Sequence, residues 1–280
     1  MRYEGTHTGT YGLRLPKVDY FDVWNELKGF WSSSGNTWNY QSYTEMYDDV
    51  YRAIKAVRPD ALVGGPYAPV GAGTASGTAH PSSIRGGFGV VDQRALDIIT
   101  YWLQHKDGAQ FVSMAGGPVA SAESPFASGQ YFVAVTDWLR GLNNQTYRGA
   151  GTLPIIWAEF YPGLASTAGV ATGHEAVAID MSTAIQAGVA GVRYMLLWEM
   201  EGDASGASPT TGEGVWTDTA KPLGGRPTAL YVALADLNHY FPPSTTLYCA
   251  IATGPISALA AGHAVLLVSQ SQSPLTVLVN

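Results

Sequence analysis

The sequence has little cysteine, little basic charge and no long apolar run. Its one cysteine, Cys249, cannot form a disulfide within the chain, and no Cys/His cluster has zinc spacing. The 15 Lys and Arg against 22 Asp and Glu give a net charge of -7, which argues against electrostatic binding of nucleic acid or an anionic membrane. The sequence contains no run of about 18 apolar residues, so it predicts no membrane-spanning helix. A neutral, weakly polar ligand fits better, and neither a metal nor a cofactor is expected.

The sequence also shows no phosphate-binding loop and no recognisable signal peptide. No G-x-G-x-x-G follows an expected strand and no G-x-x-x-x-G-K-[ST] occurs, which disfavours a doubly wound nucleotide-binding sheet. The start, MRYEGTHTGTYG, has neither the basic residues nor the apolar stretch of a signal peptide. Localisation and oligomeric state therefore cannot be read from the sequence, and a secreted or periplasmic full-length parent stays open.

Aromatic residues and glycine are abundant instead, with 8 Trp, 16 Tyr and 33 Gly in 280 residues. Trp and Tyr rings offer flat apolar faces with polar edges, which suit a sugar-binding cleft. Any single ring is as readily a core residue. The apolar share of 46% predicts a globular chain with one large domain, or a large domain and a small one.

Short apolar runs alternate with amphipathic segments along most of the chain. Strands are predicted at residues 18–24, 61–66, 109–117, 153–162 and 191–200, and helices at residues 42–57, 90–106, 126–142, 174–187 and 228–238. The first helix is expected to open with a capping box at Ser42 and Glu45. This alternation is typical of a parallel sheet covered by helices.

Polar side chains stand where these strands end, at Glu26, Ser113, Glu159 and Glu199. Residues at the carboxyl ends of several strands are typical of a (β/α) barrel enzyme. The predicted fold class is therefore α/β, a (β/α)8 TIM-barrel type, but five strands make it incomplete. Residues 1–242 are expected to form this partial catalytic barrel. Residues 243–280 hold short β-like runs without helices, which predict the truncated start of a β-sandwich-like accessory domain.

Two of these carboxylates suit glycoside hydrolysis. A retaining enzyme needs one carboxyl to protonate the leaving oxygen and a second, about 5 to 5.5 Å away, to attack the anomeric carbon. Glu26 and Glu159 stand about three βα units apart, which in a barrel lets them face each other across the mouth. Beside the first, Asn25 is placed to hold a sugar hydroxyl, although an Asn after a strand is equally a turn former.

The segments VWNELKGFW, YTEMYDDVYRAIKAVRPDALVGGP, IIWAEFYP and YMLLWEME resemble the clan A glycoside hydrolases, and most closely family 39, the β-xylosidase and α-L-iduronidase group. The resemblance implies that Glu26 is the acid/base, Asn25 its hydroxyl-holding neighbour and Glu159 the nucleophile. It also implies that Trp198 forms the floor of the sugar site, and Tyr161 is a further candidate for substrate contact. In that group the Asn-Glu pair ends the fourth barrel strand, so the five strands would be the fourth to the eighth, without the first three.

Some positions depart from the family pattern. Ser113-Met114-Ala115-Gly116 stands where a Ser-x-His-like segment is common, and Ala158 stands where Thr or Ser is commoner. Trp31 is a candidate for stacking on a sugar, and packing against its own loop is as well supported.

The predicted function is a retaining hydrolase, β-xylosidase-like, that cleaves O-glycosidic bonds of a plant or microbial oligosaccharide or polysaccharide. The alternative is a catalytically inactive truncated barrel or a carbohydrate-binding remnant, because an open sheet exposes two unpaired edges. A different barrel enzyme, such as a lyase, has no need of this Glu pair.

Overall fold

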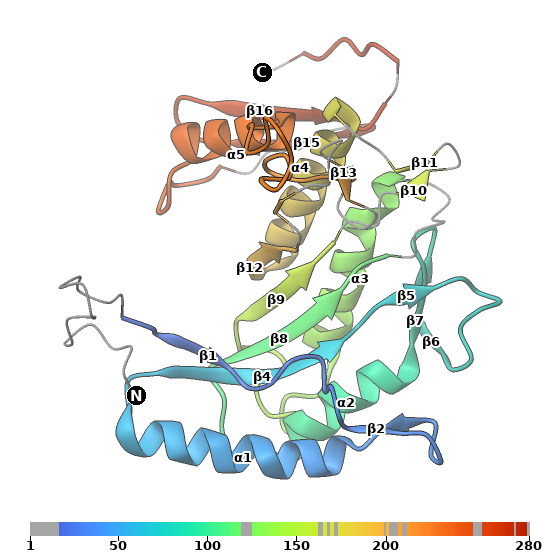
Figure 1. The fold of residues 1–280 in the computed structure, drawn as a ribbon, viewed down its shortest axis with the longest axis vertical. Helices are drawn as coiled ribbons and strands as arrows, with labels where there is room; N and C mark the ends of the chain where they lie inside the picture. The colour runs from blue at the N-terminus through green and yellow to red at the C-terminus, as the bar shows by residue number, and fades with distance from the viewer. Residues whose placement is uncertain are drawn as a thin grey trace.

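The structure is a computed structural model that describes residues 17–118, 125–161, 165–166, 169–170, 173–198, 200–201, 207–208, 212–248, 254–271 and 273–278. Its main sheet has five parallel strands in the order β1 (Tyr20–Asp22), β4 (Leu62–Pro69), β8 (Phe111–Gly116), β9 (Ile155–Phe160) and β12 (Val192–Leu197) (Figure 1). Four helices connect them: α1 (Tyr40–Val57), α2 (Gln93–His105), α3 (Ser128–Gly141) and α4 (Gly173–Ala190). Because the strands follow the sheet in chain order without a reversal, the sheet is wound as in a barrel and not doubly wound.

The sheet is strongly curled. Tyr20 of the first strand and Tyr194 of the last have ring centroids 5.7 Å apart. Four strand spacings would hold these residues roughly 19 Å apart in a flat sheet, too far for side chains that stand perpendicular to it. The five strands therefore form a half-barrel, which confirms at this level of detail the predicted α/β fold with an incomplete TIM barrel.

The main core lies between this sheet and helices α1, α2 and α3 (Figure 1). Its largest fully buried side chains come from α1, α2, α3 and β9: Tyr43, Tyr47, Trp102, Tyr131, Phe132 and Trp157. Trp157 of β9 packs against Phe132 of α3, with ring centroids 4.7 Å apart. This packing holds β9 against α3 at a point two residues before Glu159.

The starts of helices α1 and α2 were predicted wrongly. Helix α1 begins at Tyr40, and its N-cap is Asn39, whose side chain accepts a hydrogen bond from the Ser42 amide at 3.1 Å, so there is no capping box at Ser42. Helix α2 begins at Gln93 with Asp92 as its N-cap. The preceding residues, predicted to be helical, instead pair as a strand, and cross-strand hydrogen bonds outweigh helix propensity there.

Short antiparallel strands lie in the loops that connect the main elements. A hairpin of β2 (Trp31–Ser32) and β3 (Thr37–Trp38) follows Glu26, and β5 (Ala72–Gly73), β6 (Pro81–Gly86) and β7 (Gly89–Asp92) form a three-stranded sheet before α2. The second of these regions was predicted as a loop, because its Gly, Ala and Ser content hides a short alternation of buried and exposed residues in β6. The 3-10 turn η1 (Pro125–Ala127) leads into α3. Two-residue strands pair as β10 (Ala165–Ser166) with β11 (Gly169–Val170), and as β13 (Ala207–Ser208) with β14 (Gly212–Glu213).

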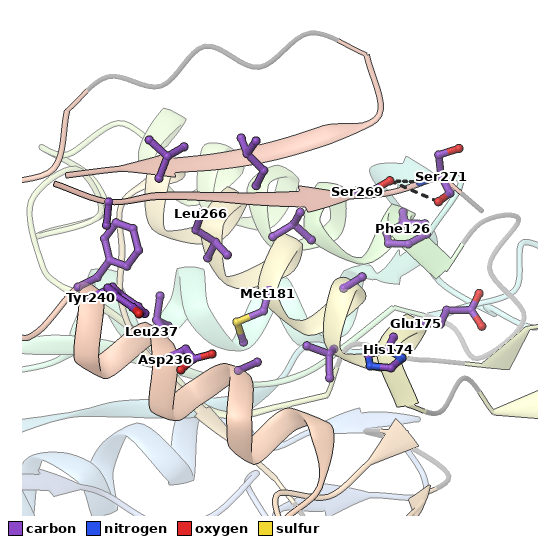
Figure 2. Close-up of a pocket in the computed structure, with 18 of the residues that line it drawn as sticks. Phe126, His174, Glu175, Met181, Asp236, Leu237, Tyr240, Leu266, Ser269 and Ser271 are labelled. Carbon is purple, nitrogen blue, oxygen red and sulfur yellow. Dashed lines mark hydrogen bonds between the residues drawn. The ribbon is translucent and has the colours of Figure 1, made fainter. Parts of the chain in front are cut away.

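The last described part of the chain packs onto α4. Helix α5 (Ala229–Tyr240) and the antiparallel hairpin of β15 (Ile256–Ala260) and β16 (Val265–Ser269) share a second cluster with α4, built on Met181, Leu230 and Val268. A mainly apolar cavity of about 910 Å³ lies between these elements (Figure 2). Cys249 lies outside the described residues, and the domain division at residue 242 stays a prediction.

Within the described residues, no helix is both long and apolar enough to span a bilayer. Across the same residues, no group of three or more His, Cys, Asp or Glu side chains is arranged to hold a metal ion.

Candidate active site

The loop after β1 carries Glu26 at the carboxyl end of the sheet. Trp24, Glu26 and Leu27 have φ values of 74°, 50° and 49°, so the chain turns sharply as the strand ends. The Leu27 side chain is fully buried beneath this turn, and the Trp24 indole donates to the Lys28 carbonyl at 2.8 Å. The buried Leu27 and this bond hold the turn, so that Asn25 and Glu26 follow the strand end as the sequence predicts.

Glu159 is turned out of the core by an irregularity in β9. Met114 of β8 pairs with Trp157, but the next residue, Ala115, pairs with Glu159, so Ala158 is an extra residue. Such a bulge re-aims a side chain. Trp157 and Phe160 are buried against Phe132, whereas the Glu159 side chain is only partly buried. Its carboxylate therefore faces away from the helices.

Two hydrogen bonds converge on one oxygen of Glu159. The Tyr67 phenol donates to Oε1 at 2.6 Å, and the Asn25 amide donates to the same atom at 3.5 Å. The short phenol bond is charge-assisted when Glu159 is ionised, and such bonds are the stronger kind. The Asn25 bond joins the loop after β1 to β9, across the two strands that lie between them in the sheet.

Glu26 and Glu159 act on a common neighbour. Burial, together with the negative charges of Glu26 and Glu159, raises the pKa of Tyr161 to about 12. The Tyr161 ring also meets Trp198, with centroids 6.0 Å apart. The Lys28 ammonium is 3.1 Å from Glu26 Oε2 and 2.5 Å from Asn25 Oδ1. Both predicted catalytic carboxylates and both aromatic candidates thus gather around one place.

The structure does not bring Trp31 into this group. Its ring packs against Trp38 at 4.9 Å, and the Arg94 guanidinium lies 5.4 Å from the ring centroid. Among the described residues, no contact joins it to either carboxylate, so its substrate role stays a prediction. Glu199, the polar residue expected at the end of the last strand, lies outside the described residues.

Sequence reasoning missed Tyr67. The strand was predicted to end at Pro66, which left Tyr67 in the following loop, whereas β4 continues to Pro69. Pro66 pairs with Ser113 but Ala68 pairs with Met114, so Tyr67 is the extra residue of a second bulge. The tyrosine directly after a glycine-rich strand was the available signal, although a bulge depends on the neighbouring strand and has no reliable pattern of its own.

Asp22, the last residue of β1, was also missed. Its carboxylate accepts a hydrogen bond from Ser113 Oγ at 2.7 Å. Burial raises the pKa of Asp22 to about 7, and the bonds from Ser113 and from the Val23 amide oppose this rise. The folded protein therefore holds a proton on this carboxyl at a pH where an unfolded Asp, with a pKa of about 3.9, has lost it.

This raised pKa predicts how stability changes with pH. Between about pH 4 and 7 the folded state binds more protons at Asp22 than the unfolded state, so its contribution to the free energy of unfolding falls as pH rises. Asp22→Asn, which does not titrate, should lose less stability than the wild type over this range. Urea unfolding at several pH values measures the difference. Glu45→Gln, an exposed change on α1, should follow the wild type, and an equally parallel Asp22→Asn curve would contradict the raised pKa.

No protein-family model and no curated protein matches the chain. Among solved structures, it is similar to a GH39 β-xylosidase from Caulobacter crescentus, with a TM-score of 0.50 and 18% identity over 89% of this chain and 47% of that one. The chain shares its fold with part of that enzyme. The similarity of fold therefore agrees with the sequence resemblance to family 39.

Two further solved structures are similar over much of the chain. A monomeric β-xylosidase from Caulobacter crescentus CB15 has a TM-score of 0.48 and 18% identity, over 78% of this chain and 41% of its own. The endo-β-1,4-mannanase from Thermotoga petrophila has a TM-score of 0.48 and 14% identity, over 92% and 51%. The chain spans about half the length, or less, of these three proteins.

Proposed function

We propose that the protein is a retaining glycoside hydrolase, with Glu159 as nucleophile and Glu26 as acid/base. One observation carries the proposal: the Lys28 ammonium contacts both Glu26 and Asn25, and Asn25 in turn donates to Glu159. Two carboxylates from the carboxyl ends of different strands therefore lie at one place, in a half-barrel similar to part of a GH39 β-xylosidase. Retention needs two close carboxyl groups in distinct roles, and the two carboxylates here have different partners. Glu159 accepts from two neutral donors, whereas Glu26 faces the Lys28 ammonium.

The reaction would proceed in two displacements. In the first, the Glu159 carboxylate attacks the anomeric carbon, the bond to the glycosidic oxygen breaks, and that oxygen takes the proton of Glu26. In the second, Glu26 removes a proton from water, the water oxygen attacks the same carbon, and the ester to Glu159 breaks. The Tyr67 and Asn25 donors hold the attacking carboxylate in one orientation, which reduces the cost of reaching the transition state.

Carbohydrate is the proposed partner, with Trp198 and Tyr161 as the aromatic wall against which a sugar ring packs. Trp198 keeps 40% of its surface exposed, so a ring face is available for stacking. A β-xylosidase-like substrate follows from the resemblance to family 39. In the same proposal the five strands correspond to the fourth to eighth strands of a barrel, residues 1–242 form the catalytic unit and residues 243–280 begin an accessory domain.

A panel of nitrophenyl glycosides that includes the β-D-xyloside tests the function. Wild type and the exposed control Glu45→Gln should release nitrophenol equally, and proton NMR should show first-formed sugar with the configuration of the substrate. Glu26→Gln and Glu159→Gln should be strongly impaired. If the wild type and both variants were equally inert while circular dichroism showed folded protein, the enzyme assignment would fail.

One observation favours the non-catalytic alternative. Among the described residues, β1 and β12 each pair with a single neighbour in the main sheet, so the half-barrel leaves two open edges. A carbohydrate-binding remnant would quench Trp fluorescence on addition of xylo-oligosaccharides without cleaving them. Trp198→Ala should abolish that quenching, whereas Glu159→Gln should leave it in place. An enzyme would instead show turnover that is lost with Glu159→Gln.

A further inference from the structure

Tyr67 reaches Glu159 from an unfavourable backbone conformation. Its φ is +52°, in the left-handed region that bulky residues seldom adopt. A residue stays there only when its surroundings hold it, and such residues cluster at functional sites. Because Tyr67 is the extra residue of the β4 bulge, the pairing of β4 with β8 passes over it. Another partner has to fix its backbone.

That partner is Ser113, a fully buried residue of β8. The Tyr67 amide donates to Ser113 Oγ at 3.0 Å, and the Ser113 hydroxyl donates onward to Asp22 Oδ1 at 2.7 Å. The serine oxygen therefore accepts one hydrogen bond and donates another. Because Asp22 Oδ1 accepts the hydroxyl hydrogen, its direction is fixed, which leaves the oxygen lone pairs for the Tyr67 amide.

The registers of β1 and β8 on β4 bring Asp22 and Ser113 together. Asp22 lies in register with Gly64, and Ser113 lies in register with Pro66 two residues further along β4. Asp22 and Ser113 come from strands on either side of β4, so their side chains meet across it.

We propose that Asp22 and Ser113 form a clamp that positions Tyr67, and through its phenol orients the Glu159 carboxylate for attack. The proposal rests on the proposed function and adds two positioning residues to it. Neither side chain contacts the reacting atoms. The chain of contacts runs from Asp22 to Ser113, from Ser113 to the Tyr67 amide, and from the Tyr67 phenol to Glu159.

The neighbours of Asp22 are mainly neutral donors and phenols. Tyr43 and Tyr47 of α1 and Tyr67 of β4 all feel its negative charge, and Ser113 of β8 and the Val23 amide donate hydrogen bonds to it. A neutral Asn keeps an oxygen that accepts from Ser113, whereas Ala leaves the serine hydroxyl without an acceptor. Asp22→Asn should therefore retain more of the clamp than Asp22→Ala.

A double-mutant cycle tests the clamp through activity. Ser113→Ala should lower kcat on an aryl glycoside about 10-fold or more with KM within about 2-fold, because a positioning residue acts on the chemical step. In a Tyr67→Phe background the same change should alter kcat by less than about 2-fold, since the phenol that it positions is already gone. Ser82→Ala, which removes another buried serine, serves as the control and should leave kcat unchanged in both backgrounds. Equal losses in both backgrounds would overturn the proposal.

A second readout is independent of turnover. In Ser113→Ala, hydrogen exchange of the Tyr67 amide should accelerate about 10-fold or more, and the ¹³C resonance of the Glu159 side-chain carboxyl should move in the same direction as in Tyr67→Phe. Ser82→Ala should change neither signal. Unchanged exchange and an unmoved Glu159 resonance would refute the clamp. An inert wild type that shows both changes would instead refute the proposed function and leave the clamp standing.

Discussion

Replacing Glu159 with glycine is expected to lower kcat on an activated aryl glycoside on the order of 10⁴-fold or more, because the attacking group itself is lost. Sodium azide should restore part of the activity. The anion enters the space left by the carboxylate and attacks the anomeric carbon from the same face, so the product is a glycosyl azide of inverted configuration.

Glu26→Gly is the matched comparison. With an activated leaving group the first displacement needs little proton donation, so the loss should fall mainly on the second step, in which Glu26 activates water. Azide then attacks the covalent intermediate, and the glycosyl azide should retain the substrate configuration. Opposite configurations in the two variants would assign the two roles. A retained product from Glu159→Gly would mean that another group is the nucleophile.

Replacing Trp157 with alanine is expected to cost about 3–5 kcal/mol of the free energy of unfolding, as large core truncations do. The ring is fully buried and packs against Tyr131 and Phe132, with centroids 5.6 and 4.7 Å away. It also directly precedes the bulge that turns Glu159 outward. Activity per folded molecule should therefore fall together with stability.

Trp31→Ala provides the control for this change, because the ring is 44% exposed and belongs to a short hairpin. Trp31→Ala should lower the free energy of unfolding by less than about 1 kcal/mol. Urea unfolding followed by circular dichroism measures both variants. If Trp157→Ala unfolded within about 1 kcal/mol of the wild type, the contact between α3 and β9 would not be the anchor of the site.

The sequence predicted which elements form the main sheet better than it predicted where each element begins and ends. Five apolar runs separated by amphipathic segments correspond to β1, β4, β8, β9 and β12, because buried parallel strands are nearly continuous in hydrophobicity. The start of α1 was misplaced, since Asn39 and Ser42 are both good N-caps and tertiary packing decides between them. The small sheet of β5 to β7 was missed because its Gly, Ala and Ser content hides the short alternation of buried and exposed residues in β6.

Within the site, the sequence predicted the two carboxylates, and Asn25 beside the first, from motif and spacing. The resemblance supplied their roles, and the structure adds the contacts. Tyr67, Ser113 and Asp22 act together only because two strands slip in register by one residue. A bulge is a relation between strands, so the tyrosine that meets Glu159 could not be identified from its own segment.

Trapping the glycosyl-enzyme intermediate tests the central claim most directly. A 2-deoxy-2-fluoro-β-xyloside with a dinitrophenyl leaving group slows both steps, and the good leaving group lets the covalent ester accumulate. After proteolysis, mass spectrometry should find one sugar bound to the peptide that contains Glu159, and Glu159→Gln should remain unlabelled. A sugar on Glu26 or on any other residue, in folded protein that turns over aryl glycosides, would contradict the assignment of Glu159 as the nucleophile.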